Sequence, residues 1–126
     1  MKYILASVLL MLSIFIEAQE HTKEYNKLFN TASKKYLNGD YYGAVKIYDQ
    51  LYKIDSEDKE LNYYLGVCNY ETKNYKAAEQ NFLKTSSAIS LELFRYKAAI
   101  AHINMKFKKA LNFYNAYKLI SGKKEF

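Results

Sequence analysis

The chain has 126 residues, a formal net charge of +6 and an apolar fraction of 50%, which suits one domain or a short array of repeats. It contains no proline and only four glycines, and this scarcity of helix breakers favours an all-helical fold. Its single cysteine excludes an internal disulfide. Only one of the 19 basic residues, Arg95, is an arginine, whereas nucleic-acid recognition relies on arginine, so the charge does not indicate a nucleic-acid partner.

The first 18 residues have the pattern of a secretory signal peptide. Lys2 supplies a positive charge, an uncharged and mainly apolar run extends from Tyr3 to Ile16, and the sequence turns polar after Ala18. We therefore predict cleavage near Ala18 and an exported location, in the periplasm or associated with the cell envelope. The apolar run is shorter than the roughly 20 residues that a transmembrane helix needs. An uncleaved membrane anchor is the alternative.

Beyond the leader, apolar residues recur at the three- and four-residue spacing of amphipathic helices. One such segment carries Ala44, Ile47, Tyr48, Leu51 and Ile54. Short polar connectors separate the segments, as closely packed antiparallel helices require. The sequence predicts helices at about 23–37, 41–54, 59–72, 75–87, 91–104 and 107–120.

A short motif occurs three times along the chain. Each copy is an aromatic residue, two further residues and an alanine, and the three alanines are Ala44, Ala78 and Ala110. The first two alanines are 34 residues apart and the last two are 32 apart. A period of about 34 residues is typical of helix–turn–helix repeats. Each alanine is expected to let two helices approach closely, because a bulkier side chain there would cost about 1–3 kcal/mol in overpacking.

With this motif and this period, residues 25–121 resemble the tetratricopeptide repeat family. The family keeps a small residue in the first helix of each repeat, and Ala32, Gly66 and Ala98 stand at that position. The resemblance implies a right-handed α-solenoid of three helical hairpins. The implied organisation is a signal peptide (1–18), a short segment (19–24), three repeats (25–58, 59–90 and 91–121) and a tail (122–126).

The resemblance also implies a function, because tetratricopeptide proteins bind an extended peptide or a partner helix in a groove lined by the first helix of each repeat. Carried over position by position, the groove residues of this chain are Phe29, Ser33, Tyr36, Tyr63, Val67, Tyr70, Arg95, Ala99 and His102. The alternative is that several of these tyrosines merely cover neighbouring helices. Chaperone-binding members of the family hold a terminal carboxylate with lysine and asparagine. Phe29 and Ser33 replace those two residues, so a chaperone adaptor is not expected.

A second resemblance is to the tetratricopeptide segment of larger bacterial envelope proteins that also carry an OmpA-like peptidoglycan-binding domain. It is carried by residues 61–68 (LNYYLGVC) and 110–118 (ALNFYNAYK). Nothing in this chain is similar to the later domains of those proteins, so the resemblance implies a stand-alone or shortened relative. A structural subunit of an envelope complex, tethered to the membrane by an uncleaved leader, is the other functional alternative.

The last predicted helix has an apolar side with no repeat after it. It carries Leu111, Tyr114, Tyr117, Leu119 and Ile120, and the residues that follow are too few for a capping helix. We expect this side to be covered by a second copy of the chain, by a partner or by a continuation of the polypeptide.

Residues that could carry catalysis or bind a metal do not group in the sequence. His21 and His102 are far apart and have no cysteine or carboxylate at metal-ligand spacing, so both are predicted to be surface residues. Cys68 lies on the apolar face of its helix and is predicted to be a buried core residue. Glu57 and Asp58 fit the N-terminus of a helix, where they complement its dipole. We therefore predict a protein that is not an enzyme and that binds no cofactor and no metal.

Overall fold

The computed structural model describes residues 3–4 and 21–122 of the chain. Within this part the protein is all-helical, with six helices and no strand, which confirms the predicted class. None of the described helices is long and apolar enough to cross a membrane, and the predicted leader lies almost wholly outside the described residues. The helices are α2 (Lys23–Leu37), α3 (Tyr41–Ile54), α4 (Lys59–Glu71), α5 (Tyr75–Leu83), α6 (Leu93–Ile103) and α7 (Phe107–Gly122).

The predicted helix bounds agree with the structure to within two residues, except at the C-terminal end of α5. Helix α5 ends at Leu83, four residues before the predicted end, and α6 begins at Leu93, two residues after the predicted start. The intervening segment is rich in serine and threonine, whose side chains compete with helical hydrogen bonds by bonding to nearby backbone. Ser90 does so here, because its Oγ accepts a hydrogen bond from the backbone N–H of Glu92 at 3.2 Å.

Three of the helices begin at a side chain that caps their first N–H groups. Thr22 caps α2 by accepting from the N–H of Tyr25 at 3.2 Å, and Asp40 caps α3 by accepting from the N–H of Gly43 at 2.9 Å. Asp58 caps α4, which confirms the prediction that the Glu57-Asp58 pair opens a helix. Such caps satisfy backbone donors that have no partner within the helix.

The turns inside the three helix pairs share one geometry. Gly39, Lys73 and Met105 each adopt a left-handed conformation, with φ angles of 76°, 65° and 59°. These residues are spaced like the sequence repeat. The residue after each of them donates a backbone hydrogen bond to a carbonyl five positions earlier, at 2.7–2.9 Å: Asp40 to Lys35, Asn74 to Asn69 and Lys106 to Ala101. This bond is typical of helix ends that close with a left-handed residue.

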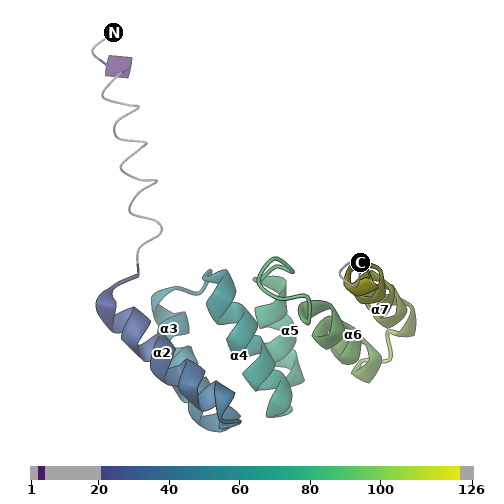
Figure 1. Ribbon diagram of the computed structural model, residues 1–126, viewed down its shortest axis with the longest axis horizontal. Helices are drawn as coiled ribbons and strands as arrows, with labels where there is room; N and C mark the ends of the chain where they lie inside the picture. Colours follow the sequence, from purple (N-terminus) through teal and green to yellow (C-terminus); the bar gives the residue numbers. More distant parts are fainter. Residues whose placement is uncertain (1–2, 5–20, 123–126) are drawn as a thin grey trace.

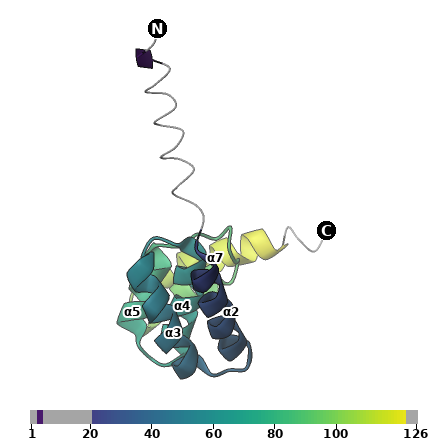
Figure 2. The same ribbon diagram turned by 90° about the vertical axis from the view of Figure 1, so that its left-hand side faces the viewer.

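Consecutive helices pack as three pairs, α2 with α3, α4 with α5 and α6 with α7, which lie side by side in a row (Figure 1). Figure 2 looks along this row from the α2–α3 end. The first helices of the pairs also contact one another, α2 with α4 and α4 with α6. By contrast, α3 and α5 have no Cα atoms within 8 Å of each other, and neither do α5 and α7. The first helices are therefore closer together than the second ones.

Small residues stand where the paired helices approach most closely. Ala44, Ala78 and Ala110 are 0%, 0% and 3% exposed, as predicted for the close-packing positions. Gly66 of α4 faces α5, where a Cβ atom added to it would lie 2.5 Å from Cε1 of Phe82. A methyl group does not fit there without movement of the ring.

Helix α4 takes part in two hydrophobic clusters. Its Leu61, Leu65 and Cys68 pack with residues of α2 and α3. Its Tyr63 and Val67 pack in a second cluster with residues of α5 and α6. The burial of Cys68 confirms the prediction, and it raises the pKa of the thiol to about 12, so this cysteine is not a reactive thiolate at neutral pH.

Three buried asparagines connect α4 to α5. The side-chain amide of Asn69 donates to Oδ1 of Asn81 at 2.9 Å, and the amide of Asn81 donates to Oδ1 of Asn62 at 3.1 Å. Asn62 in turn donates to the backbone carbonyls of Ser56 and Asp58. Each buried amide is thus hydrogen-bonded, as a low-dielectric interior requires.

The two histidines differ in their surroundings. His102 is exposed, as predicted. His21 is less exposed than predicted, and it has a carboxylate beside it that the spacing along the sequence did not indicate. Its ring is half-buried and its Nε2 atom lies 2.8 Å from Oδ2 of Asp55. The two residues are 34 positions apart, so the spacing of ligands along the sequence gave no sign of the contact.

Candidate partner-binding groove

A hollow of about 350 Å³ opens where α4, α6 and α7 meet. It is lined by Tyr70 and Glu71 at the end of α4, by Glu92, Arg95, Tyr96 and Ala99 at the start and along α6, and by Tyr114 of α7. Tyr70, Arg95 and Ala99 are three of the groove residues predicted from the repeat register. The hollow therefore brings together predicted positions from two successive first helices.

Tyrosine rings form one part of the lining. The rings of Tyr70 and Tyr96 meet edge to face with their centroids 5.2 Å apart, and Tyr96 also stacks on buried Phe82 at 5.6 Å. Burial raises the pKa of both tyrosines. Their hydroxyl groups therefore stay neutral at physiological pH and can both donate and accept hydrogen bonds.

Charged side chains form the other part of the lining. Nη1 of Arg95 donates a hydrogen bond to Oε2 of Glu92 at 2.6 Å, and the guanidinium lies 5.7 Å from the ring centroid of Tyr117. The hydroxyl of Tyr117 donates to Oε1 of the same carboxylate at 3.1 Å. Glu71 adds a second carboxylate. These groups can bond to the backbone and polar side chains of a bound segment.

Phe29, Ser33 and Tyr36, the predicted groove residues of α2, are half-buried and lie apart from the hollow. Phe29 meets the ring of Tyr48 edge to face at 5.5 Å, and Tyr36 meets the ring of Tyr64 at 5.1 Å. The hydroxyl groups of Ser33 and Tyr48 are 3.1 Å apart and share a hydrogen bond. Contacts with α3 and α4 therefore cover much of the surface of these residues.

Two predicted groove residues of α4 lie inside the protein. Tyr63 is 6% exposed and Val67 is 1% exposed, and both belong to the cluster that joins α4 to α5 and α6. They support the first helices from within and offer little surface to a partner. For Tyr63, the alternative that a tyrosine covers a neighbouring helix therefore applies. His102, at the end of α6, contacts the ring of Phe107 at 5.4 Å and does not line the hollow.

Sequence reasoning missed four residues of the lining: Glu71, Glu92, Tyr96 and Tyr114. The repeat register names fixed positions on the first helix of each repeat, so it passes over Tyr114, which lies on a second helix. It also passes over Glu92, which precedes α6. The signal that was available is the cluster of tyrosine and charged residues around Arg95.

No protein-family model matches this chain, and no curated protein sequence matches it either. The resemblance to tetratricopeptide repeats therefore rests on the sequence motif and its period.

Proposed function

We propose that the protein is a tetratricopeptide-type α-solenoid that acts as a non-catalytic scaffold for protein–protein interaction. Three observations support the repeat assignment. The helices pack as three pairs, each pair closes with the same left-handed turn, and the turns recur at the period of the sequence motif. The contacts between first helices, and their absence between the described second helices, fit a curved row with the first helices on its inner side.

The proposal includes export to the periplasm or cell envelope, supported by the signal-peptide pattern of residues 1–18. An exported scaffold meets proteins and peptides rather than nucleic acid. A shortened relative of envelope proteins with an OmpA-like domain fits the same location. Self-association through α7 belongs to the same proposal, because Leu111, Leu119 and Ile120 are 57%, 64% and 38% exposed on that helix.

The observation that carries the binding function is the hollow between α4, α6 and α7. Alignment with the tetratricopeptide repeats, a family that binds peptides, predicts Tyr70, Arg95 and Ala99 as groove residues from the sequence alone. In the structure these three residues line one cavity. Tyrosine and arginine are also the residues that most often dominate binding energy at protein interfaces.

The size of the hollow favours an extended peptide over a helix. Its volume of about 350 Å³ is at the lower end of the pockets that bind ligands, so it accommodates one or two side chains. An extended segment can place such side chains in the hollow while its backbone bonds to the tyrosine hydroxyls and charged groups around it. Glu71, Glu92 and Arg95 together carry a net negative charge, which favours a segment with a basic side chain.

The test is selection of binding peptides from a displayed random library on the purified protein. The Ala99→Trp variant places a large ring in the hollow and should weaken the selected peptides at least about tenfold, as should loss of the Arg95 or Tyr70 side chain. Gln80→Ala changes an exposed residue of α5 and should leave the affinity unaltered. Circular dichroism on each variant checks that it is folded. Equal affinity for the parent and the Ala99→Trp variant would exclude the hollow as the binding site.

A further inference from the structure

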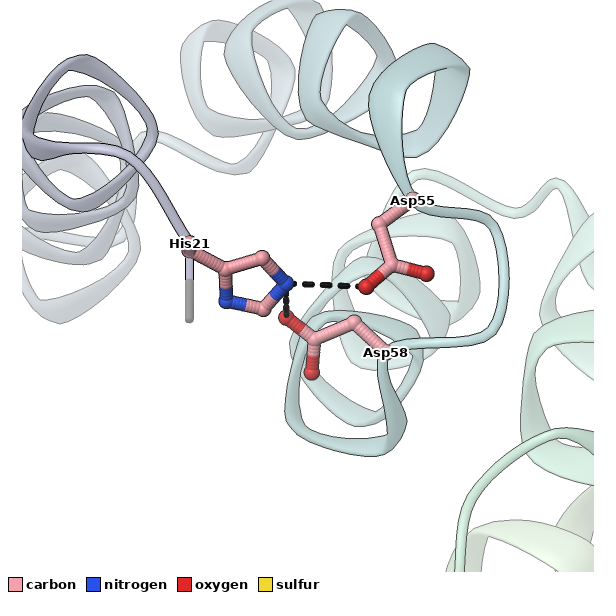
Figure 3. A group of neighbouring side chains, drawn as sticks. All are labelled: His21, Asp55 and Asp58. Atoms are coloured by element: carbon pink, nitrogen blue, oxygen red, sulfur yellow. Dashed lines mark hydrogen bonds and ion pairs between the residues drawn. The ribbon is translucent and has the colours of Figure 1, made fainter. Parts of the chain in front are cut away.

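A histidine and two aspartates meet at the start of the described repeats (Figure 3). His21 precedes α2, whereas Asp55 and Asp58 lie on the connection between α3 and α4. One ligand atom from each residue, Nε2 of the histidine and one oxygen of each carboxylate, lies within 4.8 Å of the other two. Folding has thus brought His21 to two aspartates that lie 34 and 37 residues further along the chain.

Each of the two carboxylates is held by backbone N–H groups through one oxygen and directs the other at the imidazole. Oδ1 of Asp55 accepts from the N–H of Glu57, and Oδ1 of Asp58 accepts from the N–H groups of Glu60 and Leu61. The Oδ2 atoms lie 2.8 Å and 3.7 Å from Nε2 of His21. The carboxylates are therefore oriented by the fold before any ion binds.

The imidazole ring is oriented as well. It stacks on the ring of Tyr25 with 3.8 Å between centroids and 16° between planes. The hydroxyl of Tyr25 donates to Oδ2 of Asp58 at 2.7 Å. Metal sites commonly have such outer partners, which fix the direction of a ligand and tune its basicity.

The separations fit a small divalent cation. Ligands at about 2.0–2.1 Å from a tetrahedral zinc ion are about 3.3 Å apart, and the two Nε2–Oδ2 distances of 2.8 Å and 3.7 Å lie on either side of that value. The third separation, between the two carboxylate oxygens, is no more than 4.8 Å. The side chains of His21 and Asp55 are 32% and 37% exposed, so the ion could enter from solvent and keep a water molecule as a further ligand.

We propose that His21, Asp55 and Asp58 form a binding site for a first-row divalent transition metal, with Zn²⁺ as the best-fitting ion. One imidazole nitrogen and two carboxylate oxygens are ligands that Zn²⁺ accepts, whereas Ca²⁺ and Mg²⁺ are hard cations that take oxygen ligands and do not favour an imidazole nitrogen. Two carboxylates also balance the charge of a divalent ion. The site ties the start of α2 to the connection between α3 and α4, so metal binding stabilises the N-terminal end of the described row.

Titration calorimetry on the full chain tests the proposal. The chain is purified in a mild detergent and without a histidine tag, and Zn²⁺ is compared with Ca²⁺. We expect binding of Zn²⁺ and not of Ca²⁺, with affinity for Zn²⁺ at least about tenfold lower in His21→Gln and in Asp55→Asn, each of which removes one ligand. Asp49→Asn is the matched control, because it removes an aspartate of α3 outside the cluster and should leave Zn²⁺ binding unchanged.

Two further measurements separate a metal site from a purely structural hydrogen bond. Zn²⁺ should raise the melting temperature of the parent and of Asp49→Asn, but not that of His21→Gln. The parent should also bind Co²⁺ with visible absorption bands characteristic of low coordination number, a readout that needs no variant. Absence of Zn²⁺ binding in the parent, or equal affinity in the parent and a folded His21→Gln variant, would overturn the proposal and leave the triad as a tether between helices.

Discussion

Substitution of Gly66 by alanine tests the close packing of α4 on α5 with the smallest possible change. The added methyl carbon would lie 2.5 Å from Cε1 and 2.7 Å from Cδ1 of Phe82, both well inside van der Waals contact. The ring is 1% exposed and stacks on Tyr96, so it has little room to move. The variant therefore has to separate the two helices or distort the side chain.

Two opposing effects determine the magnitude. Overpacking in a dense core costs about 1–3 kcal/mol, and contacts this short belong in the upper part of that range. Alanine is more favourable than glycine inside a helix by about 1 kcal/mol, which offsets part of the cost. We expect Gly66→Ala to lower the free energy of unfolding by about 1–2 kcal/mol, and the melting temperature by several degrees, since about 1 kcal/mol corresponds to about 4–8 °C in a domain of this size.

A double-mutant cycle followed by thermal and urea unfolding makes the test specific. Phe82→Val removes the three ring atoms that meet the added methyl group. In that background only the helix preference of alanine is left, so Gly66→Ala should become stabilising. The sign of the effect is thus expected to reverse. If Gly66→Ala destabilises equally in both backgrounds, the contact with Phe82 is not its cause and the packing of this helix pair is wrongly assigned.

Two further predictions concern a turn and an acidic side chain. Met105 is 78% exposed and adopts a left-handed backbone conformation, which costs a residue with a Cβ atom about 1–2 kcal/mol. Met105→Gly should therefore raise the free energy of unfolding by about 0.5–1 kcal/mol. An unchanged or lower value in urea unfolding would contradict this. The hydrogen bond from His21 lowers the pKa of Asp55 below its ordinary value of 3.8. The stability that this carboxylate contributes is therefore fully present above pH 3.8 and is lost as the pH falls through the lowered pKa. The stability difference between the parent and Asp55→Asn should therefore shrink in acid, and a difference that stays constant across the pH series would refute the assignment.

The helices could be predicted from the sequence because their causes are local. The three- and four-residue apolar spacing placed α2 and α3 between the correct residues, and the acidic pair at 57–58 marked the start of α4. The segment 84–92 was harder, because serine and threonine bond to nearby backbone in ways that a periodicity does not register. Met105 and Lys73 gave no sign of left-handed turns by themselves. That these two turns are equivalent to the one at Gly39 became evident only from their backbone angles.

The candidate groove could be predicted only in part. Three of the residues that the register names, Tyr70, Arg95 and Ala99, line one hollow. The register did not distinguish them from Tyr63 and Val67, which share the same helix faces but are covered by residues of other helices. Burial depends on how far neighbouring helices are displaced and rotated, and these quantities arise from packing between elements.

The sequence by itself determined that the described part of the protein is all-helical, how many helices it has and roughly where they end. It also determined the spacing at which the motif recurs. Those features follow from interactions within a few turns of one helix and from small residues that tolerate close contact. Only the tertiary structure decided which side chains meet over long separations. It brought His21 to Asp55 and Asp58 and formed the hollow between α4, α6 and α7. Contacts of this kind leave no local pattern, because the residues that form them belong to different helices and are related only by the way those helices pack.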